Sequence, residues 1–162
     1  MEKDETCKGF VFFFKQDLLN PERSKKSARV FENAVAWLLS LIGFSTVLLG
    51  SYENLRIPET KYVVGSIDII AYRENEHLLL IDCDTSIPDD RKIRSMIGVV
   101  DHFKNLQGRD RRPNIVSIIF SPKDCTGISK GNQSVKIADR HVIESIFKDA
   151  MKGNAERARS YF

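Results

Sequence analysis

The sequence predicts an α/β domain in which one central mixed β-sheet is flanked by helices on both faces. Helix-type and strand-type periodicities follow one another in the order α-β-β-β-α-β-β-α. Strands such as Leu78–Ile81 are apolar on both sides, which indicates cover on both faces of the sheet. With 162 residues, 42% of them hydrophobic, the chain suits one domain. We expect that domain over 1–162, with an N-terminal extension at 1–23, a core at 24–153 and a tail at 154–162.

The first half of the core is predicted as a helix followed by three strands. Apolar residues recur every three to four positions over Ser24–Ile42, and Gly43 stands where a helix C-cap is expected. Phe44–Leu49 is a short strand. The runs Tyr62–Tyr72 and His77–Asp84, separated by a polar turn, form a hairpin.

The second half alternates between helices and strands. Asp89 and Asp90 suit the positive N-terminus of a helix that runs to Leu106. The further elements are a buried strand over Asn114–Phe120, a short strand over Ser134–Ala138 and a helix from Arg140 to about Lys152. Gly153 marks a break, after which the tail is either a short helix or a frayed end.

The N-terminal run Phe10–Phe14 (FVFFF) is apolar but lacks the basic lead-in, length and cleavage site of a signal peptide. We predict that it packs on the core, with an oligomer contact as the alternative. No stretch approaches the roughly 20 apolar residues of a membrane span. Three cysteines without a C-x-x-C pair argue against a zinc ribbon or disulfide framework. These features predict a cytoplasmic protein with no membrane partner.

Three aspartates stand out because they lie in apolar strand-like runs. Asp68, Asp82 and Asp84 are costly to bury unless a cation offsets their charge. Strand alternation places Asp82 and Asp84 on one face and Cys83 on the other, where Cys83 is expected to be an inert core residue. Two carboxylates and a main-chain carbonyl would suit Mg²⁺. The alternative is that Asp82 and Asp84 cap the strand end and bond to the following turn.

The runs Gly65–Ala71 (GSIDIIA) and Leu78–Thr85 (LLLIDCDT) resemble the core of the PD-(D/E)XK phosphodiesterase superfamily, which has the restriction-endonuclease-like fold. The similarity is greatest to the branch of Holliday-junction resolvases and methylation-dependent restriction endonucleases. In that branch a helix that carries a glutamate and ends in Gly-Phe precedes the hairpin. Phe31–Val35 (FENAV) and Gly43-Phe44 resemble this helix. The resemblance covers about Arg29–Gly153.

The resemblance implies a divalent-metal-dependent DNA endonuclease. Asp68, Asp82 and the carbonyl of Cys83 would bind Mg²⁺ or Mn²⁺, with Glu32 as an accessory carboxylate unless it simply faces solvent. The metal polarises a phosphate and lowers the pKa of the attacking water. The family's lysine, two residues after the second acid, stabilises the transition state, but this chain has Asp84 there.

The loss of a positioned cation is expected to cost a factor of about 10² to 10³ in rate. A cation from elsewhere in the chain would compensate for the missing lysine. Lys92 is the main candidate, unless it is an exposed first-turn residue, and Arg91, Arg94 and Lys61 are the others. The alternative is that Asp84 acts as an additional metal ligand.

The formal charge of +3 is too small to prove a nucleic-acid partner. Arg109, Arg111, Arg112 and Lys130 are candidate DNA-binding residues, with solvated loops as the alternative. Three interpretations stay open: a nuclease with a relocated cation, an inactive nuclease-fold module that binds nucleic acid or assembles with proteins, and a protein-interaction domain with structural acids. A homodimer also stays open.

Overall fold

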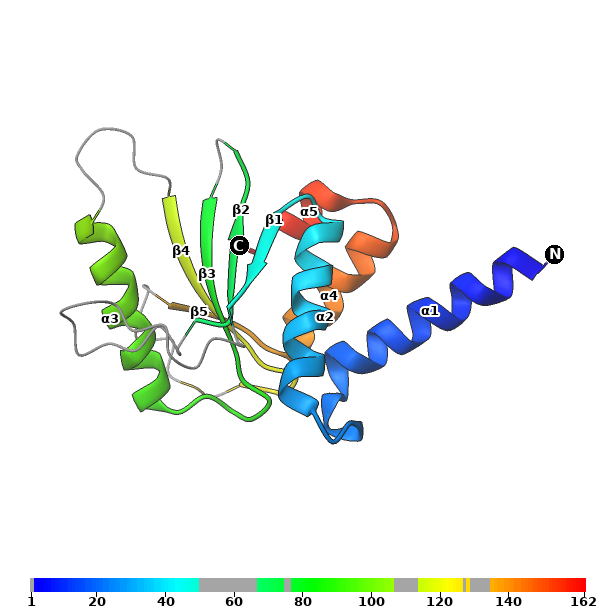
Figure 1. The fold of residues 1–162 in the computed structure, drawn as a ribbon, viewed down its shortest axis with the longest axis horizontal. Helices are drawn as coiled ribbons and strands as arrows, with labels where there is room; N and C mark the ends of the chain where they lie inside the picture. Colours follow the sequence, from blue (N-terminus) through cyan, green and yellow to red (C-terminus); the bar gives the residue numbers. More distant parts are fainter. Residues whose placement is uncertain (1, 50–66, 75–76, 107–113, 127, 129–134) are drawn as a thin grey trace.

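The computed structural model describes residues 2–49, 67–74, 77–106, 114–126, 128 and 135–162 (Figure 1). The elements within these residues are, in chain order, α1 (Glu2–Leu19), the 3-10 turn η1 (Pro21–Arg23), α2 (Ser27–Leu41), β1 (Ser45–Leu48), β2 (Ile69–Tyr72), β3 (His77–Cys83), α3 (Asp90–Leu106), β4 (Asn114–Phe120), β5 (Val135–Ala138), α4 (Arg140–Met151) and α5 (Ala155–Arg159). No helix in the described ranges is long and apolar enough to span a membrane.

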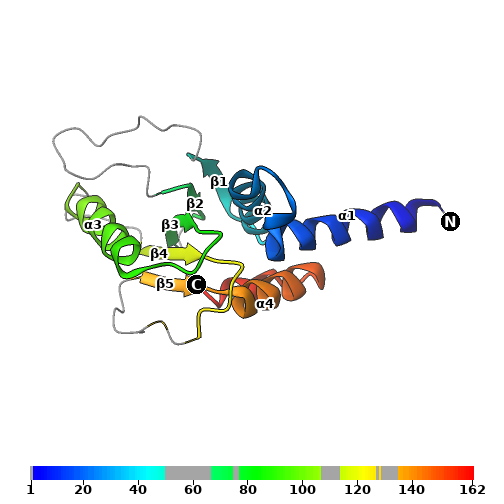
Figure 2. The ribbon, with the colours of Figure 1, turned by 90° about the horizontal axis from the view of Figure 1, so that it is seen from below.

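The five strands form one sheet in the order β1-β2-β3-β4-β5. β1, β2 and β3 pair antiparallel, whereas β4 and β5 run parallel to β3. Helix α3 covers one face of this sheet, and α1, α2, α4 and α5 lie on the other (Figures 1 and 2). The prediction of an α/β domain with a mixed sheet and helices on both faces is therefore confirmed.

The core has two layers because successive strand residues point to opposite faces. In β3, Leu79, Ile81 and Cys83 pack in the layer formed with α2 and α4, whereas Leu80 packs in the layer under α3. Asp82 lies two residues after Leu80 in the same strand, so its side chain points to the same face of the sheet, which is the face that α3 covers. Cys83 is buried on the opposite face, as the alternation predicts.

Helix α2 starts three residues later than predicted and ends where the sequence predicts. Pro21–Arg23 forms η1 and Ser24 is extended, so the regular helix begins at Ser27. At the other end Gly43 has φ = 95°, its N–H donates to Ser40 O at 3.1 Å, and the N–H of Phe44 donates to Leu39 O at 3.1 Å. This pair of bonds is a Schellman motif, which reverses the chain into β1.

The prediction that Phe10–Phe14 packs on the core is wrong for most of this run. The run lies in α1, and Phe14 belongs to the core together with Leu18 and Leu19 farther along the helix. Phe10, Phe12 and Phe13 are each more than half exposed. The reason is that successive side chains of a helix point in different directions, so Phe14 faces the core while Phe12 and Phe13 beside it do not. The N-terminal half of α1 projects away from the other helices (Figure 1).

The C-terminal tail is part of the core. Gly153 has φ = 75° and separates α4 from α5, as the predicted break requires. Ala158 and Phe162 are buried, and the Phe162 ring lies 6.0 Å from that of Phe44 and 6.2 Å from that of Phe120, measured between centroids. Lys136 Nζ donates a hydrogen bond to the main-chain oxygen of Phe162. The tail after Gly153 is therefore a short helix and not a frayed end.

Candidate functional site

The predicted acidic residues and one basic residue meet where β3 ends. Asp68 directly precedes β2, and Asp82 is the penultimate residue of β3. Asp84 follows β3 directly, and Lys92 lies in the first turn of α3. Glu32 lies on α2, near enough to Asp68 and Lys92 for their charges to shift its pKa.

Asp68 is anchored to the end of β3 by two hydrogen bonds. Its N–H donates to Ile81 O at 2.8 Å, which continues the β2–β3 ladder beyond Ile69. Its side-chain Oδ2 accepts a hydrogen bond from the N–H of Cys83 at 2.7 Å. The ladder therefore holds this carboxylate beside the strand that carries Asp82.

Asp82 is the most deeply buried acid of the site, with 3% of its surface exposed. Burial raises the pKa of Asp82 to about 7; the ammonium of Lys92 opposes this shift and the neighbouring Asp68 carboxylate adds to it. Oδ2 of Asp82 lies 3.2 Å from Lys92 Nζ but receives no hydrogen bond of good geometry from the described residues. A buried carboxylate oxygen without a donor is suited to binding a cation.

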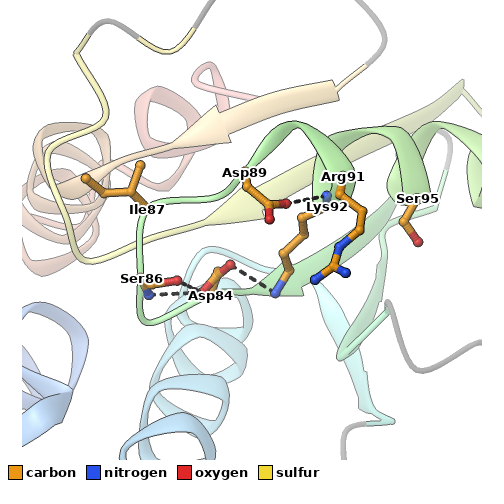
Figure 3. Close-up of a pocket in the computed structure, with 7 residues that line it drawn as sticks. All are labelled: Asp84, Ser86, Ile87, Asp89, Arg91, Lys92 and Ser95. Carbon is orange, nitrogen blue, oxygen red and sulfur yellow. Dashed lines mark hydrogen bonds and ion pairs between the residues drawn. The ribbon is translucent and has the colours of Figure 1, made fainter.

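Lys92 brings a positive charge between two of the aspartates. Its Nζ lies 3.2 Å from Asp82 Oδ2 and 3.1 Å from Asp84 Oδ2. Partial burial opposes the charged form, but the two carboxylates outweigh it and raise the pKa of Lys92. Oδ1 of Asp89 accepts a hydrogen bond from the N–H of Lys92 at 2.8 Å, an N-cap contact that starts α3 and orients its first turn (Figure 3). Lys92 is therefore not simply an exposed first-turn residue.

Asp84 combines a turn contact with an ion pair. Its Oδ1 accepts hydrogen bonds from the N–H of Ser86 at 2.9 Å and from Ser86 Oγ at 2.7 Å, while Oδ2 faces Lys92 (Figure 3). Partial burial acts against ionisation, but the bonds from Ser86 and the charge of Lys92 prevail and lower the pKa of Asp84. The alternative of a strand-end cap thus holds for Asp84, in addition to its charge pairing.

Glu32 faces the acidic site from α2 and is half-buried. Burial and the Asp68 carboxylate raise the pKa of Glu32, and the charges of Arg29 and Lys92 act in the opposite direction. Burial, followed by the charges of Asp68 and Asp82, raises the pKa of the Cys83 thiol well above its ordinary value. The thiol is therefore held protonated on the core side, and only the backbone of Cys83 is chemically available to the site.

An open pocket of about 440 Å³ lies beside Lys92, between residues 84–89 and the first turns of α3. Arg91 and Lys92 extend from α3 in the same direction, whereas Ile87 points away from them (Figure 3). Ser86 and Ser95 add hydroxyl groups to the lining. Sequence reasoning missed Ser86, although an aspartate followed two residues later by serine is a known signal for a side-chain-bonded turn.

The residues present fit a divalent cation in part. Asp68, Asp82 and the carbonyl of Cys83 are oxygen donors of the kind that Mg²⁺ prefers, and the contact of Asp82 Oδ2 with the Lys92 ammonium is an ion pair without a hydrogen bond of good geometry. Within the same residues no three histidine, cysteine, aspartate or glutamate side chains converge tightly enough to enclose a metal by themselves. An incoming cation would compete with the Lys92 ammonium for Asp82.

Several predicted residues lie outside the described part of the chain. These are Lys61, one candidate for the relocated cation, and the candidate DNA-binding residues Arg109, Arg111, Arg112 and Lys130. Arg94 is exposed on α3 and does not line the pocket. Of the candidate cations in the described residues, Lys92 is therefore the one that contacts the acids.

We compared the chain with protein-family models, with curated proteins and with solved structures, and none of the three comparisons finds a match.

Proposed function

We propose that the chain is a divalent-metal-dependent nuclease that hydrolyses phosphodiester bonds in DNA, with Lys92 in the role of the lysine that Asp84 replaces. One observation carries this proposal: Lys92 Nζ lies 3.2 Å from Asp82 and 3.1 Å from Asp84, although it comes from a different element. A cation at this position supplies what the motif lacks. It remains charged at neutral pH because its two partners raise the pKa of Lys92.

Each residue of the site has a role in this proposal. Asp68, Asp82 and the carbonyl of Cys83 would hold Mg²⁺ or Mn²⁺, which when bound acts as a Lewis acid and lowers the pKa of a water molecule. Lys92 donates a charge-assisted hydrogen bond to a phosphate oxygen and stabilises the negative charge that develops there. Glu32, whose pKa is raised by burial and by the Asp68 carboxylate, is the accessory carboxylate that accepts a proton from the attacking water.

A second candidate function is a nuclease-fold module that binds nucleic acid or protein without catalysis. The observation in its favour is the same ion pair, because an ammonium between Asp82 and Asp84 neutralises them without any metal. Asp84 is also engaged by Ser86 through Oδ1, which leaves it little freedom to become a metal ligand. The two candidates differ in whether a divalent cation displaces Lys92 from Asp82.

Cleavage assays separate the two candidates. The purified protein is incubated with supercoiled, linear and branched DNA in Mn²⁺ or Mg²⁺, with a chelator as the blank. We expect nicking by the wild type and its loss in Asp82→Asn and Asp68→Ala. Cleavage that persists in Asp68→Ala would overturn the site assignment.

Asp84→Lys completes the test, because it restores the family's lysine at its usual place. If DNA is cut only by Asp84→Lys, the second candidate is correct and the wild type is a degenerate nuclease. If the wild type already cuts DNA, catalysis does not require a lysine at position 84, as expected when Lys92 takes its role.

A further inference from the structure

A solvent-exposed aromatic surface on α1 and α2 has no part in the proposed function. We call it the aromatic face and define it by three side chains that line one groove between α1 and α2, each more than half exposed: Phe10 (56%), Phe13 (66%) and Trp37 (59%). Leu41 is exposed one turn beyond Trp37 on α2, whereas Val11 and Phe12 are exposed on other sides of α1. A typical soluble monomer does not leave this many large aromatic side chains together in water.

The aromatic face is ordered by contacts between aromatic rings. The Phe10 ring lies 6.2 Å from that of Trp37, and the Phe12 and Phe13 rings pack edge to face at 5.7 Å, measured between centroids. The Phe10 ring also stacks with Phe14, which joins the core through Phe147. A groove of about 230 Å³ runs between the helices, and Asp17 and Asn33 contribute polar atoms to its lining. The surface therefore has a preformed shape and a firm base.

We propose that a second copy of this chain docks on the aromatic face and forms a homodimer through α1. The first argument is area. Three aromatic side chains that are more than half exposed, together with Leu41, leave on the order of 400 Å² of apolar surface, since an aromatic side chain offers about 150–250 Å². A standard interface buries about 800 Å² per partner, of which roughly 65% is apolar in homodimers. The aromatic face thus supplies most of the apolar share of a stable dimer.

The second argument is self-complementarity. The N-terminal half of α1 projects away from α2 and α4 (Figure 1). The groove lies beside the rest of the same helix, where Phe10 and Phe13 line it together with Trp37 of α2. A twofold axis would bring the exposed rings of each copy against the groove of the other, and the same surface would serve both copies. One contact of this kind covers the aromatic face on both chains.

The charge of α1 favours a protein partner over a membrane surface. Over Glu2–Leu19 the sequence has three lysines against four carboxylates, a net charge of −1. Helices that lie in a membrane interface are instead rich in lysine and arginine on the polar face, which draws them to anionic lipid. Docking of a second copy of this chain does not require a basic polar face on α1.

Sedimentation velocity of the full chain tests the dimer over about 1 to 100 μM, a range that brackets moderate affinities. We expect a dimer for the wild type. Phe13→Asp and Trp37→Asp should each raise its dissociation constant by about 30-fold or more, as the loss of an interface hot spot does. Both side chains are exposed in the monomer, so circular dichroism should show that the variants fold. Val47→Asp is the matched control, because Val47 is 57% exposed on β1 rather than on α1 or α2, and it should remain dimeric.

Three outcomes would overturn the proposal. These are a wild type that stays monomeric across the range, a dimer that survives both aromatic substitutions, and a monomer that pellets with phosphatidylcholine–phosphatidylserine vesicles. The last outcome would assign the aromatic face to a membrane. None of these measurements involves metal or DNA, so the dimer and the nuclease proposal stand or fall separately.

Discussion

The acidic site and the aromatic face depart from the usual distribution of residues in opposite ways. At the end of β3 a carboxylate is almost fully buried, whereas on α1 large rings lie in water. The buried Asp82 has a counter-charge within the chain, Lys92, whose Nζ lies 3.2 Å away, although burial still raises the pKa of Asp82. The exposed Phe10 and Trp37 rings lie 6.2 Å apart, but more than half of each surface remains uncovered. The comparison indicates that the chain supplies a counter-charge for its buried acid but no cover for its exposed rings.

Removal of the charge of Lys92 should have the largest effect. Lys92→Met leaves Asp82 and Asp84 without their counter-charge and removes the proposed phosphate contact. We expect cleavage to fall by a factor of about 10² to 10³. Lys104→Met is the matched control, since Lys104 is exposed in the last turn of the same helix. Initial rates of plasmid nicking measure both variants, and equal rates for the two would show that Lys92 has no catalytic role.

A pair of phenylalanine truncations compares covered and uncovered rings on α1. Phe14 is 7% exposed and lies 5.6 Å from the Phe147 ring, so Phe14→Ala should lower the free energy of unfolding by about 3 kcal/mol. Phe12→Ala removes an exposed ring and should cost the monomer less than about 0.5 kcal/mol. Urea unfolding at low protein concentration measures both. Similar losses for the two would contradict the distinction between core and surface on this helix.

The buried acid should make stability depend on pH. The pKa of Asp82 is raised to about 7 in the folded chain from an ordinary value of 3.8, so the folded state binds the proton more tightly than the unfolded state. This contribution is fully present below pH 3.8 and is lost as pH rises through 7. From pH 5 to 8 the free energy of unfolding should fall by about 2 to 3 kcal/mol.

Chemical denaturation of the wild type and of Asp82→Asn across this pH range measures the contribution. Asp82→Asn should flatten the dependence, because an amide does not titrate. A bound divalent cation would favour the ionised carboxylate, so saturating Mg²⁺ should reduce the slope in the wild type. An identical slope in Asp82→Asn would show that another group is responsible.

The smallest loss of stability above the level of a surface substitution is expected at Gly43, which ends the helix that carries both Glu32 and Trp37. Gly43 has φ = 95°, and an added Cβ would lie 3.7 Å from the Arg159 side chain, which is an ordinary contact. Gly43→Ala should therefore cost about 1 kcal/mol of backbone strain without a steric clash. Thermal unfolding measures this cost, while cleavage and dimer affinity should stay near wild-type values. A larger loss would mean that the turn into β1 is under further constraint.

Much of the fold was predictable because burial imposes a local period. The strand Asn114–Phe120 has the predicted bounds, and the apolar stripe of α2 correctly identified most of its buried residues. The start of α2 was predicted three residues too early, since Ser24 is extended and directly follows the 3-10 turn of η1. The exposure of Phe10, Phe12 and Phe13 was missed, because composition favours burial and does not reveal which sides of α1 its neighbours cover.

The candidate site was predictable only in part. The i, i+2 spacing placed Asp82 and Asp84 on one face, and both contact Lys92. Sequence spacing did not choose among the four candidate cations, because the distance from α3 to the end of β3 depends on how the helix packs. The N-cap contact of Asp89 and the side-chain bonds of Ser86 to Asp84 became visible only with the local geometry.

The sequence by itself determined the order of helices and strands, and it placed the side chains of Asp82 and Cys83 on opposite faces of the sheet, since both follow from neighbouring residues in the chain. It also determined that Asp84 stands where the family has lysine. Tertiary structure decided the rest, because it depends on which distant elements pack together. Packing of α3 on the sheet brought Lys92 to the acids, and packing of α2 against the hairpin brought Glu32 to them. Packing of α1 against its neighbours buried Phe14 but left the aromatic face in water.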